Sequence, residues 1–144
     1  MSRRMIFAML AVASIAFVAA PAHAGKPGSA PLTGTIELVG PARVAATDTA
    51  WPAYGDAVDF RTTVNGTVGP KTTIYVNVVC LQGSTVVFQS SGPQGTTFTL
   101  TDQAGQGLEW DGAAADCIGS LVVREEKGRN VTISYIAQQG FAVA

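Results

Sequence analysis

The chain has 144 residues, with nine basic and ten acidic side chains and 47% hydrophobic residues, which gives a formal net charge of −1. A chain of this length forms one domain that buries a substantial core. The composition argues against nucleic-acid binding, which needs a clustered basic face, because the densest basic run, REEKGR at 124–129, contains two compensating glutamates.

Residues 1–24 have the pattern of an export signal peptide. Arg3 and Arg4 precede an apolar run at 5–20, and Ala22 and Ala24 form the small-residue site that signal peptidase recognises. A transmembrane helix is the alternative, but the run of about 16 residues is shorter than the roughly 20 needed to span a bilayer. We therefore expect cleavage after Ala24, a secreted or cell-envelope location, and no stable membrane insertion after cleavage.

The rest of the chain is predicted to be a leader followed by one all-β domain. Residues 25–34 have the Gly- and Pro-containing composition of a flexible leader, and residues 35–144 contain short β-rich runs bounded by turn residues. We expect strands at 35–40, 43–46, 56–64, 72–82, 85–91, 96–101, 115–126 and 131–143. Seven or eight strands in about 110 residues predict an antiparallel β-sandwich of the immunoglobulin type.

The connection QGS at 82–84 bears on the register of one hairpin. A three-residue loop would pair Cys80 with Val86 and Val78 with Phe88, which keeps one face apolar. A two-residue loop would place Val78 opposite Gln89. The sequence therefore favours the three-residue loop.

Two cysteines, Cys80 and Cys117, lie in the predicted exported part of the chain. Alternation along their two strands places each cysteine on an apolar, core-facing side. An even count in an oxidising compartment predicts a disulfide between them. The pattern leaves open whether the bridge joins neighbouring strands of one sheet or crosses between the two sheets.

The residues argue against an enzyme and against a bound cofactor. The only histidine, His23, lies in the signal peptide, so the mature chain has no imidazole for a catalytic triad or for zinc. Glycine-rich runs lead into strands, whereas a phosphate-binding loop leads into a helix. We expect no catalytic residues, no cofactor and no metal site.

Five carboxylates are candidates for an acid–base pair or for calcium ligands: Asp56, Asp59, Glu109, Asp111 and Asp116. A sandwich of this size has few residues left to build the deep cleft that a glycosidase needs. The chain also lacks a calcium-binding loop motif. We expect these side chains to form hydrogen bonds in turns or to face solvent.

Five aromatic residues are the candidates for contact with a ligand or partner, and the first three are the chief ones: Trp51, Tyr54, Trp110, Tyr75 and Tyr135. Exposed, coplanar rings would stack on sugars or anchor a protein. The structural alternative is that Trp110 packs in the core near the cysteine bridge and that Trp51 covers the end of the sandwich.

Four blocks resemble a known group of proteins: WPAYGDAVDFRTTV, IYVNVVCLQGSTVVFQ, FTLT and LEWDGAAADCIGSLVV. They are similar to small secreted bacterial proteins with immunoglobulin-like domains, of the kind found in actinobacteria and some of their phages, whose function is unassigned. The resemblance covers residues 51–143 and departs at Ala113, where that group tends to have glycine, and at 102–107. It implies an immunoglobulin-like fold and says little about activity.

Together these features predict a secreted, non-enzymatic immunoglobulin-like module that contacts an unidentified protein or cell-envelope component through an exposed sheet face or edge. The alternative is a carbohydrate-binding module that uses the exposed aromatic residues.

Overall fold

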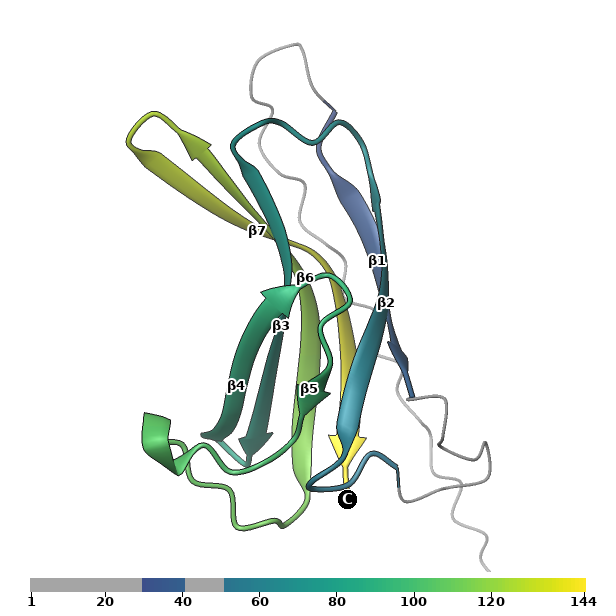
Figure 1. The fold of residues 1–144 in the computed structure, drawn as a ribbon, viewed down its shortest axis with the longest axis vertical. Coiled ribbons are helices and arrows are strands. Elements are labelled where there is room, and N and C mark those ends of the chain that lie inside the picture. Colours follow the sequence, from purple (N-terminus) through teal and green to yellow (C-terminus); the bar gives the residue numbers. More distant parts are fainter. Residues whose placement is uncertain (1–29, 41–50) are drawn as a thin grey trace, which may run out of the picture.

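The structure is a computed structural model that describes residues 30–40 and 51–144. These residues form seven strands and one short 3-10 helix, η1 (Figure 1): β1 (Thr33–Val39), β2 (Ala57–Asn65), β3 (Thr72–Gln82), β4 (Thr85–Pro93), β5 (Phe98–Thr99), η1 (Ala104–Gln106), β6 (Ala115–Lys127) and β7 (Asn130–Val143). The predicted signal peptide at 1–24 and the predicted strand at 43–46 lie outside the described residues. Thr33 and Gly34, assigned to the leader from sequence, belong to β1.

The strands form two antiparallel sheets, which confirms the predicted all-β class. One sheet has the order β1-β2-β5, and the other has the order β4-β3-β6-β7. The two layers face each other along most of their length, and the β6–β7 hairpin leans away from β1 and β2 at its turn (Figure 1).

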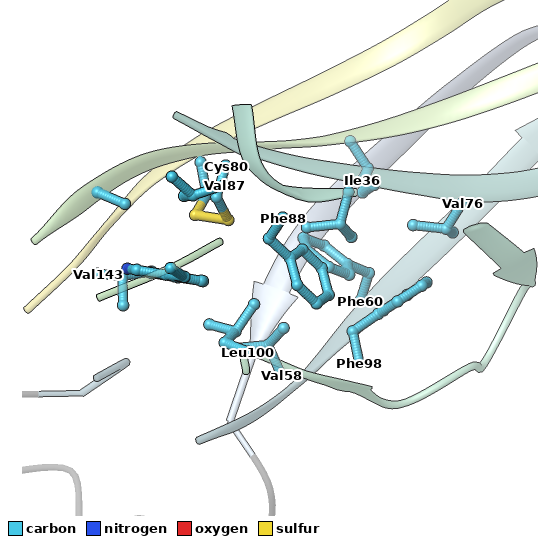
Figure 2. Close-up of a cluster of buried hydrophobic side chains, with 14 of the residues drawn as sticks. Ile36, Val58, Phe60, Val76, Cys80, Val87, Phe88, Phe98, Leu100 and Val143 are labelled. Carbon is cyan, nitrogen blue, oxygen red and sulfur yellow. A yellow bond between two sulfur atoms is a disulfide. The ribbon is translucent and has the colours of Figure 1, made fainter. Parts of the chain in front are cut away.

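The core lies between the facing sides of the two sheets (Figure 2). Because side chains alternate along a strand, every second residue of β3 from Val76 to Cys80 is buried. From the opposite sheet, Phe60 on β2 packs across the core against Phe141 on β7, with ring centroids 5.9 Å apart. Burying a side chain of this size contributes about 1.5–3 kcal/mol to folding, so the apolar alternation itself selects the pairing of the two layers.

The disulfide between Cys80 and Cys117 is confirmed, and it lies within one sheet. The two residues are direct partners in the β3–β6 register, their Cα atoms are 4.0 Å apart, and both are buried. The alternative of a bridge between the sheets is therefore excluded. A close antiparallel pair brings side chains of adjacent strands near enough to bond.

The hairpin between β3 and β4 differs from the prediction. Gln82 pairs with Thr85, so the loop has two residues, and the three-residue prediction is wrong. Gly83 has φ = 62°, a left-handed conformation that two-residue hairpin loops favour. Cys80 pairs with Phe88 instead of Val86 because the register shifts between Cys80 and Leu81.

That register shift explains how the shorter loop keeps the core apolar. One extra residue on β4, Val87, stands between the partners of Cys80 and Leu81. A bulge of this kind lets two consecutive side chains turn toward the same side, and both Val87 and Phe88 are buried. Alternation alone cannot predict this arrangement.

Gly119 on β6 marks a close approach of the two sheets. A Cβ atom placed on Gly119 would lie 2.4 Å from Cε1 of Phe60. Gly140 on β7 has no such neighbour, since the nearest atom to its Cβ position is the Cys117 carbonyl oxygen at 4.0 Å. Of these two glycines, only Gly119 is therefore required by packing.

We expect Gly119→Ala to lower the free energy of unfolding by about 1–3 kcal/mol, because the added methyl group displaces the Phe60 ring from a packed core. Gly140→Ala, the matched control, should change it by less than about 1 kcal/mol. Urea unfolding followed by tryptophan fluorescence measures both. Equal effects of the two variants would contradict the close approach at Gly119.

We expect the double variant Cys80→Ala/Cys117→Ala to lose roughly 3–4 kcal/mol of stability, since the bridge closes a loop across a sequence separation of 37 residues. Calorimetric unfolding of the oxidised protein and of the variant measures the difference. A loss below about 1 kcal/mol would show that the bridge does not constrain the unfolded chain.

Candidate functional site

The outer side of the four-stranded sheet carries a row of large side chains across three strands. Tyr75 on β3 pairs with Val122 on β6, and Val122 pairs with Tyr135 on β7. Partners in a register point to the same side of a sheet. Val122 stands between Leu121 and Val123 on β6, which point to the opposite side, and all three are buried. The two tyrosines therefore flank a valine on the side away from the core.

A second apolar row lies on the same side, nearer the disulfide. Val79 pairs with Ile118, and Ile118 is 41% exposed. Toward the β6–β7 turn, Val131 and Ile133 on β7 are 50% and 53% exposed. Their register partners on the same side are Glu126 and Arg124, which form an ion pair with each other. We call the following set the outer apolar face: Tyr75, Val79, Ile118, Val122, Val131, Ile133 and Tyr135.

A polar row separates the two apolar rows. Gln138 Nε2 donates a hydrogen bond of 3.2 Å to Ser120 Oγ, and Ser91 Oγ donates one of 2.8 Å to Asn77 Oδ1. Asn77 and Ser120 are direct partners in the register. Hydrogen bonding lets the buried Ser120 stay on this surface without an unsatisfied group.

Strand β7 forms one edge of the sheet. It is the last strand in the order β4-β3-β6-β7, and its 14 residues include no acidic or basic side chain. Tyr135 is 60% exposed. Large exposed apolar patches and unprotected edges mark sites where another molecule binds.

Of the three chief aromatic candidates for contact with a ligand, Trp110 belongs to the core. It is 4% exposed, its Nε1 donates to the Ala113 carbonyl oxygen at 2.8 Å, and its ring lies 6.3 Å from that of Phe88. This placement agrees with the structural alternative for Trp110. Its ring is closed to a ligand.

Trp51 and Tyr54 do not complete a flat platform. Trp51 is half-buried against the core, and Tyr54, at 38% exposed, meets Trp110 edge-on with an interplanar angle of 78°. Stacking on a sugar requires exposed rings with their faces open to solvent. The three chief aromatic candidates do not provide this arrangement.

The carboxylates form separate turn contacts. Asp56 Oδ2 accepts a hydrogen bond from the Ala53 amide at 2.8 Å, and Asp111 Oδ1 accepts one from the Ala113 amide at 2.9 Å.

Within residues 30–40 and 51–144, no three His, Cys, Asp or Glu side chains are grouped so that they could hold a metal ion. No helix in the same residues is long and apolar enough to cross a bilayer.

Asp102 is a structural residue that sequence reasoning missed. Its Oδ1 accepts a hydrogen bond from the Trp110 amide at 3.1 Å, and its own amide donates to the Tyr54 hydroxyl oxygen at 3.1 Å. Asp102 thus links the segment before η1 to the buried tryptophan. An aspartate in a turn-rich run gives no local signal for such a contact.

Asp111 ties the loop after Trp110 to the end of β3. Gln82 Nε2 donates to Asp111 Oδ1 at 2.8 Å and to the Ala113 carbonyl oxygen at 3.1 Å. The hydrogen bond from Gln82, followed by that from the Ala113 amide, holds the pKa of Asp111 below its ordinary value of 3.8. Hydrogen bonds to the ionised form favour that form.

A hollow of about 560 Å³ lies where the loop between β2 and β3 meets the end of β6. Lys71 and Lys127 line it together with Glu125 and Glu126. The two signs of charge offset each other there, so the hollow favours neither an anion nor a cation.

Comparison of the chain with protein-family models, with curated proteins and with solved structures finds no match in any of the three. The resemblance to secreted bacterial immunoglobulin-like proteins therefore remains a prediction. The outer apolar face is the strongest candidate for a functional site.

We expect Asp111→Asn to reduce stability near neutral pH and to make no difference in strong acid. A carboxyl group with a lowered folded pKa stabilises the fold above its unfolded pKa, and that contribution is lost as the pH falls through the folded value. Urea midpoints of the two proteins should differ at about pH 6 and converge by about pH 2.

Asp116→Asn, which makes the same charge change at an exposed site on β6, is the control for this experiment. A constant difference between Asp111→Asn and the original protein from pH 6 to pH 2 would contradict the role of the Gln82 hydrogen bond.

Proposed function

We propose that the protein is a secreted, non-enzymatic immunoglobulin-like module that binds a protein or a cell-envelope component through the outer apolar face. The observation that carries this proposal is the exposure of Ile118, Ile133 and Tyr135 on one side of one sheet. Water solvates such a surface poorly, and its burial by a partner is favourable by about 25 cal/mol per Å².

The immunoglobulin assignment is supported by the sheet orders. Three strands, β1-β2-β5, face four strands, β4-β3-β6-β7. Immunoglobulin-type sandwiches likewise place the first, second and fifth strands in one sheet and the third, sixth and seventh in the other. The bridge departs from the antibody pattern, since it lies within one sheet.

Secretion is supported by two independent features. A buried disulfide persists in oxidising compartments, and residues 1–24 have the composition of an export signal. A module with these properties acts outside the cytoplasm, where it meets envelope components and secreted proteins.

The apolar character of the face argues for binding in place of catalysis. Its two rows consist of aliphatic side chains and tyrosines, and its polar row is occupied by mutual hydrogen bonds. Catalysis requires a proton-transferring or nucleophilic group in a cleft. An exposed sheet surface with apolar rows is suited to contact with another surface.

Cosedimentation with isolated cell envelopes tests the proposal, using protein collected from the culture medium. We expect Ile118→Lys to weaken binding at least about tenfold, because a charge placed in one of the two apolar rows must be desolvated when a partner covers it. Treating the envelopes with protease or with glycan-degrading enzymes beforehand identifies which component is bound.

Val68→Lys is the matched control, since Val68 is 47% exposed but lies in the loop between β2 and β3, away from the sheet. It should bind as the original protein does. Circular dichroism and tryptophan fluorescence establish that both variants are folded. Unchanged envelope binding by folded Ile118→Lys would refute the role of the outer apolar face.

A further inference from the structure

The first half of β7 is an open edge. Within the part of the chain that the structure describes, β7 pairs only with β6, and all residues from Asn130 to Tyr135 are exposed. Figure 1 shows this end of the β6–β7 hairpin leaning away from β1 and β2. Backbone groups on the outer side of an edge strand are a template for pairing with another strand.

The edge lacks the usual protection against such pairing. Charged side chains and proline commonly block an exposed edge, and the segment Asn130–Tyr135 contains neither. The bulge at Ile136, where the β6–β7 register shifts, interrupts the edge only beyond Tyr135. There Ile136 lies against β1, since its Cδ1 is 3.0 Å from the Cβ position of Gly34.

We infer that this edge pairs with the same edge of a second copy, in an antiparallel register centred on Ile133. The inference rests on the proposed contact role of this sheet and names the partner of its free edge. Val131, Ile133 and Tyr135 project to one side, and a two-fold axis at Ile133 pairs Val131 of each copy with Tyr135 of the other. Isologous contacts need such self-complementarity.

Other registers use the segment less well. A slip by one residue places apolar side chains on opposite sides of the joined sheet. A two-fold axis at Thr132 pairs Val131 with Ile133 but sets Tyr135 opposite the charged Arg129. Only the axis at Ile133 pairs all three apolar side chains with one another, and it places no like charges directly opposite across the new edge.

The length of the open segment limits how strongly two copies can associate. Six residues per copy give an interface at the small end of specific contacts, below about 1,200 Å². Weak and transient contacts belong to this size class, so we expect a reversible association that is seen only at high protein concentration. Association would join the two four-stranded sheets into one of eight strands and make the outer apolar faces of both copies continuous.

Sedimentation equilibrium over about 1 µM to 1 mM, on protein collected from the culture medium, tests the inference. The original protein should show a monomer–dimer equilibrium. Ile133→Lys and Ile133→Glu should each be monomeric, because the axis places the two like charges face to face. An equimolar mixture of the two variants should dimerise again, more strongly at low salt.

Ile118→Lys is the control on the same side of the sheet, and it should dimerise as the original protein does. A monomeric original protein at 1 mM, dimers of either single Ile133 variant, or a mixture that stays monomeric would each overturn the inference. Envelope binding that depends on Ile118 in a monomeric protein would separate this failure from failure of the proposed function.

Discussion

The covalent link between Cys80 and Cys117 fixes the relation of the two central strands, and the remaining strands are placed relative to them. Because the cysteines are direct partners, the bond defines which residues of β3 and β6 stand opposite each other along the whole ladder. One side of that ladder is the core and the other is the outer apolar face. A displacement by one residue would exchange the two sides.

The segment from Trp110 to Cys117 serves this central pair. Trp110 fills the core near Phe88, Asp111 accepts hydrogen bonds from Gln82 and from Ala113, and the chain then enters β6. The small residues after Asp111 let the loop lie close to the end of β3, where Gln82 also reaches the Ala113 carbonyl. These turn contacts thus help to position Cys117 opposite Cys80.

Alternation and cysteine count were sufficient to predict the all-β class, most strand positions and the disulfide. They could not predict the bulge at Val87, because a three-residue loop and a two-residue turn with one extra residue both place Phe88 on the core side. The sequence named Tyr75 and Tyr135 among five candidate aromatic residues but could not show that they share a face, because the alternation of Val131, Ile133 and Tyr135 is equally typical of a core strand. Only the sheet order, set by contacts between distant segments, places these residues on an edge.

The polar row of Asn77, Ser120 and Gln138 is hydrogen-bonded and gives the outer apolar face a chemical selectivity that its two apolar rows alone would lack. A partner that covers both apolar rows must also cover these amides and hydroxyls. Its affinity is lower if it leaves them without hydrogen-bond partners. Molecules with properly spaced donors and acceptors are thereby distinguished from surfaces that are merely hydrophobic. The polar row in the middle of the surface would then distinguish one partner from another, and the two apolar rows beside it would supply most of the binding energy.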